Sequence, residues 1–245
     1  MRPVQKGISP IAGDFGKYED AKPELVSRLG LYCSYCERKI PTLLAVEHIE
    51  PKDGVYGKPA LKKRWSNFLL ACTNCNSCKG SRKVDFRRLI FPDRDNTFHA
   101  YNYNADGSIT LASHLSPRQS VMARNTLRLV GLDKPIQIYT DSNNEQVALD
   151  RVAQRMEIFG VAREALSLML SAPNSDPLKR SITMNALANG FFSIWMTVFD
   201  SYPDMKLRFI QAFDGTANSG CFDIITSGNV SPAPNPDNLS NGRKI

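Results

Sequence analysis

Hydrophobic residues recur at three- and four-residue steps through much of the second half of the chain. The clearest stripe lies within about residues 145–171 and consists of Val152, Met156, Phe159, Leu166 and Leu170. This spacing places side chains on one face of a helix. We expect two further helices, over about residues 177–200 and 203–213, and we interpret these apolar faces as core.

Shorter patterns divide the rest of the chain. Pro23, followed by apolar residues that stop at Gly30, predicts a short helix, and Ser116-Pro117 predicts the start of another that ends at Gly131. Between them, alternating residues 96–103, an Asn-Ala-Asp-Gly turn and residues 108–111 predict a β-hairpin.

Both ends of the chain are rich in residues that disfavour regular structure. Frequent Pro and Gly over residues 1 to about 20 predict an extended arm, which either lies across a partner or covers the core. Residues 226–245 consist mainly of Pro, Asn, Gly and Ser, and we expect this tail to be disordered because it can bury little apolar surface.

Charge is distributed unevenly along the chain. The chain has 245 residues with 42% hydrophobic content, enough for a real core, and this excludes disorder throughout. The first hundred residues hold 18 Lys and Arg against 11 Asp and Glu, so they carry the whole net charge of +7. A basic half indicates a polyanionic partner, although a merely soluble basic surface is the alternative. No segment has the apolar length of a membrane span, and we expect a cytoplasmic protein without a membrane partner.

Five of the six cysteines cluster in the basic half. Cys33, Cys36, Cys72 and Cys75 form two C-x₂-C pairs, which can supply four thiolates to a tetrahedral structural zinc ion (Zn²⁺). The pairs are separated by 35 residues, which is more than the usual zinc-ribbon spacing of roughly 15 to 20. The metal would therefore hold together the base of an inserted hairpin. Cys78 could replace one ligand, since it would project from nearly the same helix face as Cys75. We expect Cys221 to be a buried small hydrophobe.

A second pattern starts between the two cysteine pairs and continues past the second pair. It reads Glu47-His48-Ile49-x-Pro51, then Asn67-x₄-Cys72-x₂-Cys75-Asn76-x₂-Lys79. With the cysteine pairs, this pattern resembles the signature of HNH endonucleases. The resemblance implies a ββα-metal core with His48 on a strand, Asn67 in the connecting loop and Asn76 on the following helix. Asn76 replaces the family's more common histidine, and Glu47 replaces its usual aspartate.

The residue types fit phosphodiester hydrolysis. We expect His48 to be the general base, because neutral imidazole can deprotonate water at cellular pH. Glu47 and Asn76 offer oxygen ligands to a catalytic Mg²⁺ or Mn²⁺, with Glu50 as an alternative ligand. Neighbours on a strand point to opposite faces, so a local distortion must bring residues 47 and 48 together. We expect Asn67 to hold the loop and to orient the imidazole by accepting its other N–H.

Basic residues flank this pattern on both sides. We interpret them as phosphate contacts, with a solvated surface as the alternative. They are Lys62, Lys63, Arg64, Lys79, Arg82 and Lys83. His99 and His114 lie outside the pattern, and we expect surface or core roles for them.

More of the chain is similar to the PtuB family, the HNH nuclease subunits of bacterial Septu anti-phage systems and of some retron-associated defence modules. The similarity rests on residues 1–7, on Phe91-Pro92-x₂-Asp95-Asn96, on the hairpin, and on Asn125-Thr126-Leu127-x₃-Gly131-Leu132-Asp133 before a helix with Arg151. It implies a PtuA-like ATPase that assembles with the nuclease and restrains it. It also implies a docking role for the helical half and DNA as the target, with RNA cleavage as the alternative.

Together these patterns predict an α+β fold. We expect an extended arm (residues 1–22), a zinc-stapled HNH nuclease domain (23–95), a β-hairpin with a short helix (96–135), a mainly helical docking region (136–225) and a disordered tail (226–245). The predicted function is metal-dependent endonucleolytic cleavage within an anti-phage defence complex. The alternative is a zinc-ribbon nucleic-acid-binding or adaptor subunit without catalysis of its own.

Overall fold

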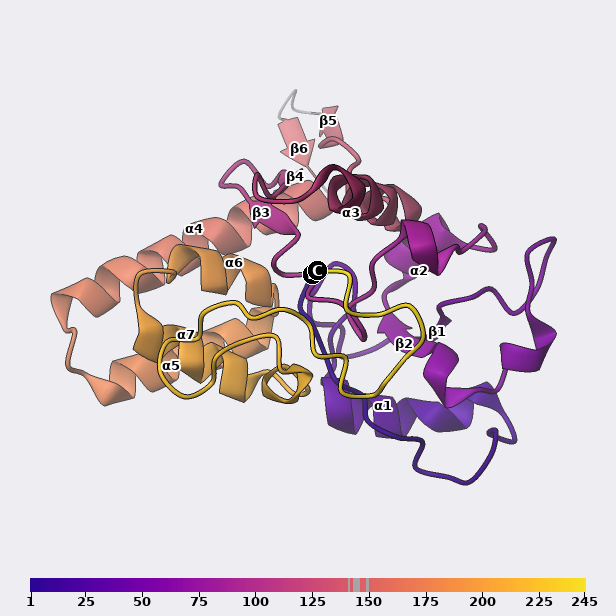
Figure 1. The fold of residues 1–245 in the computed structure, drawn as a ribbon. Coiled ribbons are helices and arrows are strands. Elements are labelled where there is room, and N and C mark those ends of the chain that lie inside the picture. Colours follow the sequence, from indigo (N-terminus) through magenta and orange to yellow (C-terminus); the bar gives the residue numbers. More distant parts are fainter. Residues whose placement is uncertain (141, 143–145, 149) are drawn as a thin grey trace.

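The computed structural model describes residues 1–140, 142, 146–148 and 150–245. Figure 1 shows α4 to α7 gathered on one side of the molecule and α1, β1, β2 and α2 on the other, with α3 and the β3–β4 hairpin above them. The elements in chain order are α1 (Lys22–Leu29), β1 (Ala45–His48), β2 (Phe68–Ala71), α2 (Thr73–Lys79), β3 (Tyr101–Tyr103), β4 (Ile109–Leu111), α3 (Pro117–Val130), β5 (Ile138–Thr140), β6 (Gln146–Ala148), α4 (Arg151–Ser171), α5 (Asp176–Asn189), α6 (Phe192–Val198) and α7 (Pro203–Ala212).

The described strands form three separate two-stranded antiparallel sheets. β1 pairs with β2 from Ala45 opposite Ala71 to His48 opposite Phe68. α2 follows β2 after a single residue, so the cysteine-bracketed segment folds as strand, strand, helix. β3 pairs with β4, and β5 pairs with β6. The β5–β6 hairpin was not predicted, because its strands are only three residues long and lie in a segment interpreted as helical.

Local capping explains where several predicted helices begin. α3 starts after Ser116, whose Oγ accepts a hydrogen bond from Gln119 N at 3.3 Å, while Gln119 Oε1 accepts one from Ser116 N at 3.0 Å. The helix expected from residue 145 has its predicted start outside the described residues. In the structure α4 starts at Arg151, because Asp150 Oδ1 accepts from Val152 N and Ala153 N at 2.8 and 3.0 Å.

The single helix predicted over residues 177–200 is wrong, because the chain forms α5 and α6 with a break between them. Gly190 and Phe191 have φ angles of 80° and 56° there. Phe191 N donates to the backbone oxygen of Glu37 at 2.9 Å, so a distant segment occupies the place where the helix would continue. Glu37 also accepts from Ser193 N at 2.7 Å, which fixes the start of α6.

The prediction of a disordered tail is also wrong. In Figure 1 the C-terminal residues, drawn in yellow, run across the molecule between its two sides. Lys244 N donates to Asp95 Oδ1 at 3.0 Å, and Lys244 Nζ donates to Leu89 O at 2.8 Å. Ile245 is only 7% exposed. The tail has few apolar side chains, but its polar groups pair with residues near 86–96.

The N-terminal arm covers the core rather than extending into solvent. Val4 N donates to Pro92 O at 2.8 Å. Lys6 Nζ lies 2.9 Å from Asp93 Oδ2, and both side chains are fully buried. The hairpin is shorter than predicted, because Asn96 folds inward and donates to the backbone oxygens of Cys221 and Ser231 at 2.9 and 2.7 Å. These contacts remove residues near 96 from the first strand.

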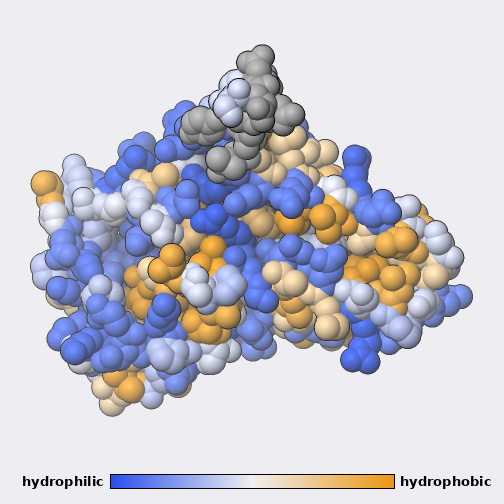
Figure 2. Space-filling view, turned by 180° about the vertical axis from the view of Figure 1, so that it is seen from behind, coloured by the Kyte–Doolittle hydropathy of each residue, from blue (hydrophilic) through white to orange (hydrophobic). Residues whose placement is uncertain are grey.

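Figure 2 shows hydrophobic residues on the rear face as separate patches among hydrophilic ones. Within the described part of the chain, no helix is both long and apolar enough to cross a membrane.

The break between α5 and α6 makes Gly190 essential for stability. A Cβ there would lie 2.4 Å from Glu37 O, at a φ of +80° that disfavours side chains. We expect Gly190→Ala to lower the free energy of unfolding by about 2–5 kcal/mol. The matched control is Gly160→Ala in α4, where a Cβ meets nothing within 4 Å. It should raise stability by roughly 0.5–1 kcal/mol. Urea unfolding of both variants measures the difference, and equal effects would contradict the prediction.

Candidate active site

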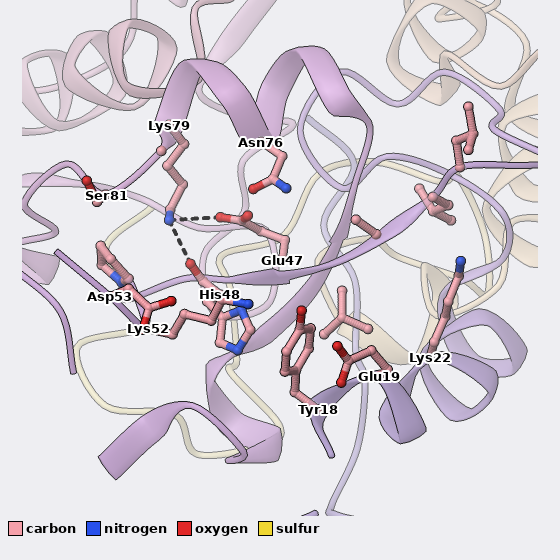
Figure 3. A pocket seen from close by; sticks show the side chains of 16 residues that line it. Tyr18, Glu19, Lys22, Glu47, His48, Lys52, Asp53, Asn76, Lys79 and Ser81 are labelled. Atoms are coloured by element: carbon pink, nitrogen blue, oxygen red, sulfur yellow. Dashed lines mark hydrogen bonds and ion pairs between the residues drawn. The ribbon is translucent and has the colours of Figure 1, made fainter. Parts of the chain in front are cut away.

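A cavity of about 500 Å³ lies between the end of β1 and one face of α2 (Figure 3). Glu47 and His48 line it from β1, and Asn76 and Lys79 line it from α2. Glu47 and His48 are consecutive residues, and β1 ends at His48. Strict strand alternation ends there, so both side chains can border one cavity.

His48 is held in one orientation. Its Nε2 lies 2.8 Å from the backbone oxygen of Lys62. A carbonyl oxygen only accepts hydrogen bonds, so Nε2 carries the proton and Nδ1 is left to accept one. Burial lowers the pKa of His48, and the Lys62 carbonyl opposes this. The rings of Tyr18 and Phe68 contact the imidazole at centroid distances of 4.8 and 5.3 Å.

Glu47 forms a buried ion pair with Lys79. Glu47 Oε1 lies 2.9 Å from Lys79 Nζ, and the two side chains are 2% and 1% exposed. Burial raises the pKa of Glu47, whereas the ammonium of Lys79 opposes that rise. Lys79 Nζ also donates to His48 O at 2.6 Å, which ties α2 to the end of β1. Lys79 is therefore engaged within the protein in this structure, and its contact with phosphate stays a prediction.

Asn76 brings an amide group next to this ion pair. It is half-buried on α2, and Figure 3 shows its side chain close to Glu47. Carboxylate and amide oxygens are ligands that suit Mg²⁺ or Mn²⁺, so the donor set fits such an ion. Glu50 is not among the described residues that line the cavity.

Asn67 contacts the backbone of the β1–β2 connection and does not hydrogen-bond the imidazole. Its Oδ1 accepts from Glu50 N at 2.8 Å, and its Nδ2 donates to Glu50 O at 2.9 Å and to Leu61 O at 3.3 Å. Of the two predicted roles, the structure shows the first, holding the loop. The second is wrong, because the hydrogen bond that orients His48 goes to Lys62 O.

The side chains of the two cysteine pairs come together in one cluster. The sulfurs of Cys33, Cys36, Cys72 and Cys75 all lie within 4.8 Å of one another, and all four residues are buried. Cys36 Sγ and Cys72 Sγ are 3.7 Å apart. A tetrahedral zinc with bonds of about 2.3 Å places sulfurs about 3.8 Å apart, so this cluster could bind zinc.

The remaining cysteines lie outside this sulfur cluster. Cys78 is half-buried, and its Sγ lies 3.9 Å from Arg151 Nη2. Arg151 Nη1 also donates to Cys75 Sγ at 3.2 Å, which places a positive charge beside the cluster. Cys221 is 3% exposed, as expected for a small buried hydrophobe.

The predicted phosphate-binding residues differ in how exposed their side chains are. Lys63, Arg82 and Lys83 are exposed and Lys62 is half-buried. Arg64 is exposed but lies 3.0 Å from Asp14, which compensates its charge.

Tyr18 and Lys52 are among the side chains at the cavity that sequence reasoning missed. Lys52 Nζ lies 3.9 Å from the centroid of the Tyr18 ring, whose edge meets His48. Tyr18 belongs to a segment interpreted as an arm, and no spacing rule linked it to the HNH pattern. The role of Lys62 lies in its carbonyl, which no side-chain pattern indicates. His99 and His114 stack at 3.8 Å outside this cavity.

Comparison with known proteins agrees with this geometry. Residues 33–82 match the HNH endonuclease family model. The chain is 29% identical over 141 residues to a protein named “Retron Vc95 putative HNH endonuclease” from Vibrio cholerae serotype O1 biovar El Tor, and the match covers 53% of this chain and 68% of that protein. The matched segment contains both cysteine pairs and the cavity residues His48, Glu47 and Asn76. The chain therefore carries an HNH endonuclease domain and is a nuclease.

Proposed function

We propose that this protein is a divalent-metal-dependent endonuclease that hydrolyses phosphodiester bonds of DNA at the cavity beside β1 and α2. The observation that carries the proposal is the meeting of His48, Glu47 and Asn76 in one cavity. A base and two oxygen ligands at one site are the groups that phosphodiester hydrolysis requires.

His48 acts as the general base in this proposal. Because Lys62 O accepts from Nε2, the imidazole has a fixed tautomer whose Nδ1 can take a proton from water. Its lowered pKa keeps the ring neutral at cellular pH. Tyr18 and Phe68 restrict the ring, so little rotational freedom is lost when water and substrate bind.

Glu47 and Asn76 hold the catalytic cation, Mg²⁺ or Mn²⁺. When bound, such an ion neutralises charge on the scissile phosphate and on the 3′ leaving oxygen. The ammonium of Lys79 contacts Glu47, and its hydrogen bond to His48 O holds the base and the proposed ligand at fixed positions relative to each other.

Zn²⁺ occupies the sulfur cluster and has a structural role. The donor set of four buried thiols is closed, and a closed tetrahedral site leaves no position for water or substrate. The ligands that we propose are Cys33, Cys36, Cys72 and Cys75, without Cys78.

Exposed basic residues guide the DNA backbone to the cavity. Lys63, Arg82 and Lys83, with half-buried Lys62, flank the reaction centre in the sequence and remain accessible. DNA is favoured over RNA by the resemblance to nucleases of anti-phage defence. Arg64 contributes less, since Asp14 pairs with it.

We also propose that the nuclease works in an anti-phage complex with a PtuA-like ATPase that docks on α4 to α7. The similarity to a retron-associated protein supports this association. Co-expression with a PtuA-like ATPase, followed by size-exclusion chromatography, tests it. Co-elution ahead of either chain alone supports the complex, and separate elution contradicts it.

His48→Ala should abolish most DNA cleavage. Positioned proton abstraction contributes about 10²- to 10⁴-fold, so we expect a loss of that size in kcat with Mg²⁺ or Mn²⁺, equal to roughly 3–5 kcal/mol. His114→Ala, an exposed histidine outside the cavity, is the matched control and should cleave normally. Nicking of supercoiled plasmid measures both, and cleavage at the wild-type rate by His48→Ala would refute the assigned base.

Removal of one sulfur ligand should release zinc. We expect the purified protein to contain one zinc per chain, and Cys72→Ser to lose it together with thermal stability, because metal binding and folding are coupled. Cys221→Ala removes a buried cysteine outside the cluster and should retain zinc. Elemental analysis of the variants decides the ligand set. Zinc loss in Cys78→Ser with retention in Cys75→Ser would show that we chose the wrong sulfur.

The basic residues should make the affinity for DNA depend on the salt concentration. Neutralising both Lys63 and Lys83 with Gln should reduce the slope of log affinity against log salt concentration by up to about 0.9 for each phosphate that these lysines neutralise in the wild-type complex. Arg180→Gln, an exposed cation on α5, should leave the slope unchanged. Fluorescence anisotropy with duplex DNA at several salt concentrations measures the slopes. Identical slopes for all three proteins would exclude these phosphate contacts.

A further inference from the structure

An apolar tip projects from the connection between β1 and β2. Val55 is 94% exposed and Tyr56 is 49% exposed. They follow Lys52 and Asp53, which line the catalytic cavity. In Figure 1 this connection protrudes at the right-hand edge of the molecule. The nuclease therefore presents a valine and a tyrosine to solvent a few residues from its reaction centre.

This tip is held in a defined turn. Lys58 N donates to Pro51 O at 2.6 Å and closes the turn, and Gly57 N donates to Gly54 O at 2.9 Å within it. Gly54 has a φ of +86°, and a Cβ there would lie 3.0 Å from Ser81, so the turn lies close to the segment after α2. The side-chain hydrogen bonds of Asn67 to Glu50 fix the start of the connection. The exposed side chains are therefore pre-organised, which lowers the entropy lost on binding.

The surroundings of the tip are cationic. Lys52, Lys58, Lys62 and Lys63 lie within the same connection, and Asp53 is its only acidic residue between positions 51 and 67. A protein-binding apolar patch is usually a contiguous area of several hundred Å². Here only two large exposed apolar side chains occur, and lysines flank them in the sequence. An aromatic ring among lysines is instead typical of surfaces that stack on the bases of nucleic acids.

We propose that Val55 and Tyr56 contact unstacked bases next to the scissile phosphate, with the Tyr56 ring stacking on one base while Lys58 contacts a neighbouring phosphate. This proposal rests on the proposed nuclease function and adds a substrate preference to it. The nuclease favours strands with unpaired bases near the cleaved bond, because a paired and stacked base offers no free face to the ring.

Binding of a single-stranded DNA oligonucleotide that contains 2-aminopurine, and of the matching duplex, tests the proposal in the absence of added Mg²⁺ or Mn²⁺. The variant Val55→Ala/Tyr56→Ala should bind the single strand roughly 5- to 100-fold more weakly, with an unchanged salt slope. Its affinity for the duplex should fall much less. Wild-type protein should change the 2-aminopurine fluorescence on binding, and the double variant should not.

Two controls make the result specific. Ile225→Ala removes an apolar side chain that is 85% exposed outside this connection, and it should bind both DNAs normally. Lys58→Gln should lower the salt slope for the single strand by about 0.7 without removing the fluorescence change. Thermal unfolding of each variant verifies the fold.

Three outcomes overturn the proposal. They are unchanged single-strand affinity of the double variant, an equal loss in Ile225→Ala, and a loss confined to binding of a PtuA-like ATPase. Because the assay measures binding, it is independent of cleavage. A wild-type protein that binds through this tip but hydrolyses no DNA would refute the proposed function, and only the contact of Val55 and Tyr56 with bases would remain.

Discussion

The geometry of the candidate active site is built beside a cluster of four sulfurs, which brings together two segments separated by 35 residues. β1 and β2 are only four residues long, and a two-stranded sheet of that size is marginal on its own. Cys72 is also the residue that caps α2, so the sulfur cluster fixes the start of the helix that carries Asn76. If zinc binds there as we propose, its affinity stabilises the hairpin and the helix at once. The strands also pack into the main hydrophobic core, in which Phe68, Leu69 and Leu70 are fully buried, so the proposed metal adds to that support.

The residue after the first cysteine pair links this unit to the helical half. Glu37 has a φ of 68°, and its carboxylate is buried. Burial would raise the pKa of Glu37, but the Met1 amino group and the bonds from Ser193 bring it below its usual value. Tyr103 OH donates to Glu37 Oε1 at 3.2 Å as well. One charged side chain thus joins the arm, the β3–β4 hairpin and α6 to the sulfur cluster. The nuclease unit and the helices are therefore mechanically connected.

The elements that sequence predicted correctly are those with local causes. Pro23 and Gly30 bound α1, Ser116 and Gly131 bound α3, and paired cysteines meet as their spacing requires. These signals act within one turn of the chain, where propensity and capping dominate.

The errors arose where distant segments intervene. The break at Gly190 depends on the backbone of Glu37, and the order of the tail depends on polar groups near Asp95. At the site, the residue types and their convergence were predictable, because the HNH pattern fixes them. The partner of His48 was not, since Lys62 contributes a backbone carbonyl that any residue could supply.

The ion pair of Glu47 with Lys79 would limit how the proposed catalytic cation binds. A buried carboxylate without a partner costs several kcal/mol, so Lys79 allows Glu47 to remain charged before any cation arrives. The same ammonium repels a divalent ion at short range and must reduce its affinity. The substrate phosphate can offset this repulsion, because it brings negative charge to both cations. On this reasoning the proposed catalytic ion would bind most tightly together with the nucleic acid.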